Sequence, residues 1–441
     1  MKIPNVPRTL VGIAVLSALL VALGLLGSRG GATSRGDTSP PSMSVNQIAY
    51  VDLDGLLHLA DFDTGETLQI SPDVGLFTWP TWSPDAQRLV FSGVTRDGAS
   101  GIRISLFSYN TTLDERREFY VGDPGVLGLL ADGVAHYPQW SPDGKKLAFV
   151  TFTSRGMTLL IDDLDDNADP EFVMDDGPVW STWSPDSQYL LVHRGLDLFL
   201  VNTLEGPEIS RLETGFARYR VPAWKPRGGA VTVVVEDDSG ALRLSTAEVQ
   251  SDGLGEFQAI ADVTENPAYL WSPDGEYLAV GSSGDVIVYQ SSILYRFQRL
   301  TLLPENGSRE SIEIADDVLA YFWSPDGTKL AYATLSDQRG AMRWMLLDTK
   351  DGNRWPLVDF VPSRDQLTMF EFFDQYAYSH SLWSPDSKFL VFAGRIEEGG
   401  VSASLVSHPG HEGSHIIVVD TQANGIADQI AAGGLGVWSP R

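Results

Sequence analysis

Trp82-Ser83-Pro84-Asp85 is the first of six intact copies of one tetrapeptide in this 441-residue chain. The other five copies begin at Trp140, Trp183, Trp271, Trp323 and Trp383. Residues 224–227 read Trp-Lys-Pro-Arg, a degenerate copy, and residues 438–440 read Trp-Ser-Pro, a truncated one. Successive tryptophans of the series are 41 to 60 residues apart. Repetition at this period, with strand-forming segments between the copies, predicts a β-propeller.

Each copy also predicts a tight turn. Proline presets φ at the second position, and the Ser and Asp side chains can bond to main-chain amides of the turn. Glycine follows the aspartate at Gly144, Gly275 and Gly327 and tolerates a left-handed backbone. Ala86, Ser187 and Ser387 take this place in the other intact copies. We therefore expect those three turns to be strained or differently shaped.

A strand-like segment lies on each side of every turn. The segments before the turns end at the tryptophan and cover residues 77–82, 136–140, 179–183, 219–224, 267–271, 319–323 and 380–383. Pro80, Pro138 and Pro222 stand two residues before their tryptophans. Since proline in a sheet requires an edge, these segments should be the innermost strands, next to a central channel. No stretch beyond the N-terminus shows sustained helical periodicity, so an all-β fold is expected.

The two ends of the repeat region complement each other. Residues 48–52, 56–62 and 67–71 are predicted strands with no tryptophan-ended strand before them, whereas residues 434–438 form such a strand with nothing after it. Together they would complete one blade and close the ring. The sequence therefore predicts an eight-bladed propeller over residues 45–441.

Composition limits the classes of function. The chain has no cysteine, which excludes disulfides and thiol chemistry. Its formal charge of −27 argues against nucleic-acid or anionic-membrane binding surfaces. We expect no cofactor.

The N-terminus has the pattern of an export signal. Residues 1–8 are basic, and residues 9–28 are uncharged and long enough for a membrane-spanning helix. This predicts a signal-anchor, with a cleaved signal peptide as the alternative. Residues 29–44, rich in Gly, Ser, Thr and Pro, should be a flexible linker to an extracytoplasmic propeller.

The Trp-Ser-Pro-Asp-Gly pattern resembles the repeat of TolB-like β-propellers, which also occurs in the propeller domains of the dipeptidyl-peptidase IV and prolyl-oligopeptidase families. The resemblance covers residues 45–441 and implies a propeller fold; it says little about activity, because the repeat residues build blades. Two departures stand out. TolB-like proteins carry six blades and an additional α/β domain, and the peptidases append a hydrolase domain with a G-x-S-x-G elbow. Residues 98–102 and 400–404 both lack the final glycine of that elbow.

Candidate ligand-binding residues are those three or four positions before a blade tryptophan, which should lie near the channel mouth. They are Trp79, His136, Tyr137, Trp180, Arg220 and His380. Aromatic rings and a few polar groups around a concave opening form a plausible binding surface, although strand alternation places some of them between blades instead.

Two clusters are weaker candidates for metal binding. His408, His411 and His415 lie within eight residues, but glycine and proline between them do not enforce ligand geometry, so a plain turn is favoured over a metal site. The acidic run at residues 162–169 lacks the glycine of a calcium loop and is best explained as a solvated hairpin tip.

These observations favour a non-enzymatic, membrane-tethered propeller that binds a protein, a peptide or an envelope glycan. No nucleophile elbow and no phosphate loop occurs in the sequence. The alternative is a metal-dependent saccharide lyase or hydrolase that uses the channel. Oligogalacturonate lyases resemble this repeat and rely on clustered channel histidines, a role open here only to His136 and His380.

Overall fold

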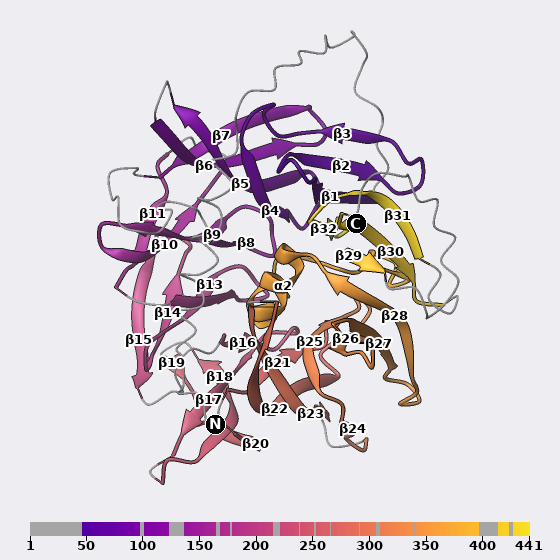
Figure 1. Ribbon diagram of the computed structural model, residues 1–441. Coiled ribbons are helices and arrows are strands. Elements are labelled where there is room, and N and C mark those ends of the chain that lie inside the picture. Colours follow the sequence, from indigo (N-terminus) through magenta and orange to yellow (C-terminus); the bar gives the residue numbers. More distant parts are fainter. Residues whose placement is uncertain are drawn as a thin grey trace.

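The computed structural model describes residues 46–97, 101–122, 136–164, 168–176, 179–214, 221–237, 239–250, 253–264, 266–290, 292–305, 309–338, 340–396, 413–422 and 427–441. These residues form an all-β structure of antiparallel sheets arranged around a central region (Figure 1). The β-propeller expected from the repeats is thereby confirmed as the fold class.

The first half of the chain forms four-stranded sheets in which neighbours in sequence pair, except that the last strand of the chain joins the first sheet. The first sheet has the order β3 (Thr67–Gln69), β2 (Leu57–Asp61), β1 (Gln47–Val51) and β32 (Leu435–Trp438). The second contains β4 (Leu76–Trp82), β5 (Arg88–Asp97), β6 (Gly101–Asn110) and β7 (Glu115–Val121). The third contains β8 (His136–Trp140), β9 (Leu147–Thr153), β10 (Gly156–Asp162) and β11 (Glu171–Met174). The fourth contains β12 (Val179–Trp183), β13 (Tyr189–Arg194), β14 (Asp197–Asn202) and β15 (Glu208–Thr214).

The second half repeats this arrangement with more links between sheets. The fifth sheet contains β16 (Ala223–Trp224), β17 (Ala230–Glu236), β18 (Leu242–Gln250), β19 (Gly253–Leu254) and β20 (Gln258–Val263). The next strands are β21 (Ala268–Trp271), β22 (Tyr277–Tyr289), β23 (Ser292–Pro304) and β24 (Ile312–Ile314). They are followed by β25 (Val318–Trp323), β26 (Lys329–Leu335), β27 (Met342–Asp348) and β28 (Arg354–Pro362), and then by β29 (Phe389–Ile396), β30 (His415–Asp420) and β31 (Ala427–Ala432). The pairs β23–β25 and β28–β29 join these three groups into one hydrogen-bonded series.

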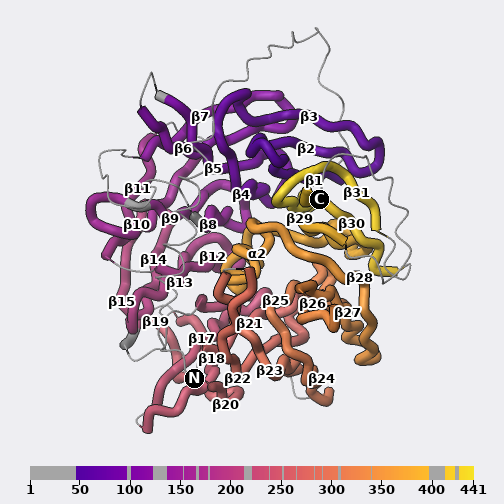
Figure 2. Tube along the Cα trace, viewed as in Figure 1, coloured from indigo at the N-terminus to yellow at the C-terminus, as the bar shows by residue number. Residues whose placement is uncertain are grey.

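The last strand pairs with the first, as the sequence predicts. Ile48 lies opposite Trp438, and Val51 lies opposite Leu435. In Figure 2 the yellow C-terminal trace accordingly lies beside the indigo β1. The Ser439 hydroxyl adds a hydrogen bond from the Gln47 amide, 3.2 Å away.

A register shift recurs in six pairs of strands, each made by an outer strand and its inner neighbour. In each case one extra residue is inserted in the outer strand, and that residue is always apolar: Phe119, Val173, Leu212, Ile260, Leu357 and Ile430. Such a bulge bends its strand and increases the local twist.

Two short helices interrupt the β-structure, contrary to the expectation of strands alone. α2 (Arg364–Glu371) and α3 (Phe373–Tyr376) follow β28 and occupy the centre of the molecule (Figure 1). The Ser363 side chain caps α2 by accepting a hydrogen bond from the Gln366 amide. The strand expected at residues 380–383 is also wrong: Trp383 makes only an isolated bridge to Leu390. The two helices take the place in the chain, between β28 and β29, where a regular inner strand was expected.

The N-terminal prediction lies outside the described residues. The signal-anchor at residues 9–28 and the linker at residues 29–44 both precede residue 46. In the part of the chain that is described, no helix has the length and apolar character needed to cross a membrane.

Candidate functional site

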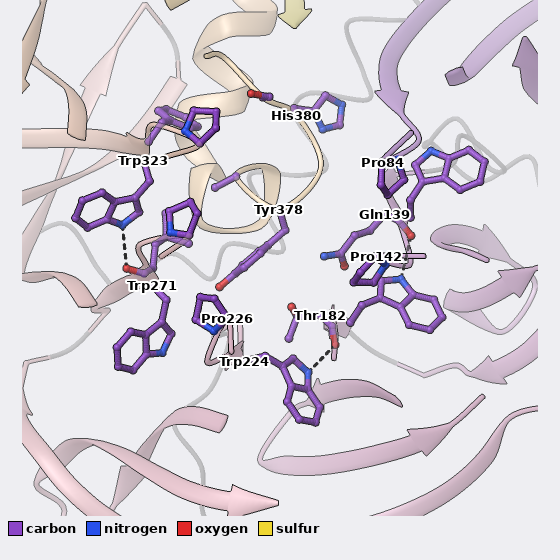
Figure 3. A pocket seen from close by; sticks show the side chains of 18 of the residues that line it. Pro84, Gln139, Pro142, Thr182, Trp224, Pro226, Trp271, Trp323, Tyr378 and His380 are labelled. Atoms are coloured by element: carbon purple, nitrogen blue, oxygen red, sulfur yellow. Dashed lines mark hydrogen bonds between the residues drawn. The ribbon is translucent and has the colours of Figure 1, made fainter. Parts of the chain in front are cut away.

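The Trp-Ser-Pro-Asp turns surround a cavity of about 600 Å³ (Figure 3). Six prolines from successive turns contribute to its wall: Pro84, Pro142, Pro185, Pro226, Pro273 and Pro325. Parts of six repeat tryptophans also line it: Trp140, Trp183, Trp224, Trp271, Trp323 and Trp383. We call this cavity the bowl.

Hydrogen bonds within each turn fix the prolines in the wall. In a representative turn, the Ser184 hydroxyl donates to Asp186 Oδ1 at 2.5 Å and accepts from the Tyr189 amide at 2.9 Å. The same Ser–Asp bond recurs in all six intact copies. The three turns without glycine have positive φ at Ala86 (60°), Ser187 (64°) and Ser387 (59°), which confirms the expected strain.

Four of the turn carboxylates, Asp85, Asp143, Asp326 and Asp386, have a lowered pKa. Burial of Asp85 would raise its pKa, but hydrogen bonds from the Ser83 hydroxyl and the Gln87 amide lower that pKa below its usual value. The pKa of Asp326 is lowered in the same way, against its burial, chiefly by the Ser324 hydroxyl and the Thr328 amide. These charges belong to the turns and do not line the bowl.

The tryptophans bind adjacent sheets together. Trp183 Nε1 donates to the Gln139 carbonyl oxygen at 3.0 Å, so the acceptor is the residue just before the preceding tryptophan. Trp140, Trp224, Trp323 and Trp383 repeat this pattern. Trp271 departs from it by donating to the Thr232 hydroxyl. The indoles therefore fill the seams between sheets, as expected, and the prolines face the bowl together with parts of the tryptophans.

The floor of the bowl comes from the segment after α3. Ala377, Tyr378, His380, Ser381 and Leu382 line it. Figure 3 shows Tyr378 extending into the space between the turns. Burial and the nearby Asp374 carboxylate raise the pKa of the Tyr378 hydroxyl, which therefore stays protonated.

His380 is neutral in this setting. Its burial lowers its pKa to about 3, although a hydrogen bond with the main chain of Trp79 opposes the shift. Its Nδ1 lies 2.7 Å from the Ser379 hydroxyl, and its Nε2 lies 3.4 Å from the Thr81 hydroxyl. An imidazole held in this way positions the floor and is not a cation at neutral pH.

Two predicted binding residues, Trp79 and Trp180, are covered by the helical insert. They are 5% and 6% exposed, respectively. Trp79 stacks on Tyr376 with ring centroids 4.5 Å apart, and Trp180 lies against Phe372 at 6.3 Å. These indoles form a clamp on the insert and are not part of the bowl wall.

Tyr137 shares an unusual backbone with Trp79. Both residues precede a proline and have positive φ, 52° and 53°, where the register of β4 and β8 shifts. This conformation costs about 1–3 kcal/mol per residue. It turns the Tyr137 ring toward Tyr376, 5.1 Å away between centroids, so the strain serves to hold the insert.

The remaining candidates are not brought together. The side chain of His136 and all of Arg220, His408 and His411 lie outside the described residues. His415 begins β30. Across the described ranges, no three His, Cys, Asp or Glu side chains are grouped in a way that could hold a metal ion.

The bowl is uncharged. None of the described residues in its lining is an Asp, Glu, Lys or Arg, and its histidine is neutral. Its polar side chains include Gln139, Thr182 and Tyr378, and the wall is otherwise largely proline and aromatic. The sequence analysis missed Tyr378 and the prolines as binding groups, although the convergence of turns in a propeller could have indicated the latter.

Comparisons with known proteins are consistent with this fold. No family model matches the chain. One subunit of eukaryotic translation initiation factor 3 from Aedes aegypti is 20% identical over 270 residues, which cover 58% of this chain and 37% of that protein. The chain thus matches little more than a third of this relative's length.

Solved structures give a likeness of fold alone. A eukaryotic initiation factor matches with a TM-score of 0.52 and 14% identity, over 90% of this chain and 99% of that one. Dihydro-heme d1 dehydrogenase NirN in complex with DHE matches with a TM-score of 0.51 and 14% identity, over 95% of this chain and 77% of that one. TolB from Acinetobacter baumannii matches with a TM-score of 0.37 and 14% identity, over 80% of this chain and 83% of that one. The likenesses with TM-scores above 0.5 support the propeller fold and carry no conclusion about activity.

Proposed function

We propose that this chain is an extracytoplasmic binding module without enzymatic activity, and that its bowl receives an uncharged peptide segment of a partner protein. The observation that carries this proposal is the absence of charged side chains among the described bowl residues in a protein of net charge −27. A concave, largely apolar site with a few polar groups is the usual form of a ligand pocket.

A peptide fits the bowl better than a glycan does. A saccharide presents many hydroxyl groups, and each one that is buried without a partner weakens binding. The bowl offers Gln139, Thr182, Tyr378 and little else to hydrogen-bond with them. Its ring of prolines and the half-buried Trp271 and Trp323 instead suit apolar side chains.

Eight blades and a closed ring are part of the proposal. The pairing of β1 with β32 supports closure, because it places the C-terminal strand as the innermost strand of the first sheet. The six intact tetrapeptides, the copy at Trp224 and the copy at Trp438 supply one inner segment for each of eight blades. A membrane tether at residues 9–28 is supported by their uncharged, apolar sequence.

The alternative, a metal-dependent lyase or hydrolase, gains no specific support in the bowl. Of its two candidate histidines, His380 is buried beneath the wall and already hydrogen-bonded through both ring nitrogens. No carboxylate side chain joins it among the described lining residues. An acidic saccharide would also meet a strongly acidic protein.

The test uses the full-length protein, purified in detergent and probed with a library of random, uncharged 12-residue peptides. Peptides that bind are retested on Ala377→Arg, which places a long cation on the floor of the bowl. The matched control is Leu204→Arg, which adds the same charge at an exposed position, 62% accessible. We expect binding to be lost in the first variant and kept in the second; equal binding by both would refute the bowl as the site.

A neutral glycan array, run in parallel, decides between ligand classes. Glycan binding that Ala377→Arg abolishes, without any peptide binding, would overturn the choice of a peptide.

A further inference from the structure

The wall of the bowl contains a buried amide whose oxygen the protein itself does not use. Gln139 lies on β8 and is 5% exposed. Its main-chain carbonyl accepts the bond from Trp183, but its side-chain Oε1 is buried without a hydrogen-bond partner among the described residues. Figure 3 shows the carboxamide pointing into the bowl.

The equivalent positions of other sheets show that the fold does not require an amide there. Each of these residues immediately precedes a repeat tryptophan. On β16, β21 and β25 these residues are Ala223, Leu270 and Phe322, all buried and apolar, whereas β4 and β12 have Thr81 and Thr182. An apolar side chain therefore fits this position. The fold therefore does not explain why a polar side chain stands at Gln139.

A buried carboxamide oxygen without a partner is uncommon, because burial removes the water to which it would otherwise bond. The exceptions call for an explanation, and a bound ligand is the one that the location of Gln139 offers. The group carries both a donor and an acceptor in one plane. A main-chain peptide amide carries the complementary pair.

We propose that Gln139 recognises one main-chain amide of the bound segment. Gln139 Nε2 donates to the carbonyl oxygen of the ligand, and Gln139 Oε1 accepts from its N–H. The Tyr378 hydroxyl, which extends into the bowl, provides a second polar contact elsewhere in it. Apolar side chains of the ligand then pack on the proline wall. This inference rests on the proposed function.

Its test combines a protein variant with modified ligands. A peptide selected on the wild-type protein is N-methylated at one amide at a time, and each version is measured with wild type and with Gln139→Met, which keeps the length of the side chain. We expect one methylation to weaken wild-type binding about tenfold, the effect of one or two neutral hydrogen bonds. The same methylation should have no further effect on Gln139→Met, which already binds about tenfold more weakly.

Gln375 provides the matched control. It is equally buried, at 3% exposed, and its Oε1 also has no partner among the described residues, but it lies outside the bowl and donates to the Ser181 carbonyl at 3.3 Å. Gln375→Met should lower the thermal midpoint and leave peptide affinity unchanged. Gln139→Met should lower peptide affinity and leave the thermal midpoint unchanged.

The outcomes separate this inference from the proposed function. If the wild type binds peptide and the methylation profile is the same in Gln139→Met, Gln139 does not read the amide, although the bowl remains the site. A loss of stability in Gln139→Met as large as in Gln375→Met would also overturn the assignment. Failure of the wild type to bind any peptide overturns both proposals.

Discussion

Trp224 Nε1 donates a hydrogen bond to the carbonyl oxygen of Thr182, 3.1 Å away. Trp224 belongs to the degenerate copy, in which Lys225 and Arg227 replace the Ser and Asp of the six intact copies. The bond between sheets therefore survives the loss of the Ser and Asp side-chain bonds, while the main-chain turn is kept: the Gly228 amide donates to the Lys225 carbonyl at 2.8 Å. The tryptophan joins blades, and the Ser and Asp side chains brace the turns; the two roles are separable.

This separation predicts the effect of Trp224→Phe. The change leaves the Thr182 carbonyl without its donor in a buried seam, which costs about 1–3 kcal/mol beyond the loss of ring area. Trp82→Phe is the matched control, since Trp82 is equally exposed (7%) and its Nε1 has no partner among the described residues. Urea unfolding should give Trp224→Phe the lower midpoint. Equal midpoints would show that the indole bond adds nothing.

Ala86→Gly should stabilise the protein. Ala86 has a φ of 60°, a left-handed conformation that costs a residue with a Cβ about 1–2 kcal/mol. Ser187→Gly relieves similar strain but removes the hydroxyl that accepts a bond from the Asp143 amide at 2.9 Å. Calorimetry should therefore show a higher melting temperature for Ala86→Gly and little change for Ser187→Gly. A fall in both would contradict this account of the turns.

Asp365 makes the stability depend on pH. Burial raises the pKa of this carboxyl to about 6, and Arg364 opposes the shift only in part. The protonated form is favoured in the folded state, so its contribution is complete below about pH 4 and is lost as the pH rises through 6.

The matching measurement compares wild type with Asp365→Asn at pH 4 and pH 8. We expect the variant to be more stable than wild type at pH 8 by about 2 kcal/mol. This is less than the pKa shift of Asp365 alone would give at about 1.4 kcal/mol per pKa unit. The reason is that Asp365 is only half-buried and the N-terminus of α2 favours its charge. At pH 4 the advantage should disappear. A difference independent of pH would rule out titration of Asp365 as the cause.

Tyr376 holds the helical insert through its ring. It is 1% exposed and contacts Trp79 and Tyr137. Tyr376→Ala should cost about 3–5 kcal/mol and expose the insert to trypsin at Arg364, whereas Tyr376→Phe, which keeps the ring, should do neither. Limited proteolysis followed by mass spectrometry reads this directly. Cleavage of the phenylalanine variant at Arg364 would point to the hydroxyl instead.

The sequence was sufficient to predict the repeated parts of the fold. The tetrapeptide fixes a turn through local hydrogen bonds, so the strands on either side followed from it, and the pairing of Ile48 with Trp438 followed from two incomplete ends. Each of these inferences depended on chemistry that is local or repeated. The repeats therefore left few alternative strand arrangements to choose between.

The helical insert could not be predicted by the same means. A helix of eight residues is too short to set a helical period in the sequence, and the buried residues of α2 include the polar Gln366 beside Leu367, Met369 and Phe370. One signal was present: Ser363 and Gln366 have the spacing of a capping box. The position of Trp79 and Trp180 depended on this insert, so the candidate site moved from their face of the channel to the opposite side, where the turns meet.

The inserted apolar residues of the outer strands bear on how this protein behaves in crowded surroundings. A ring of radial sheets presents many outermost strands, and a flat, exposed strand is a template for strand addition by another chain. Because the extra residue bends these strands, a neighbouring molecule meets an interrupted ladder of hydrogen-bonding groups. Deleting Val173 or Leu357 should straighten the outer strand and favour fibrous assembly. The bulges therefore protect the protein from aggregation through its outer strands.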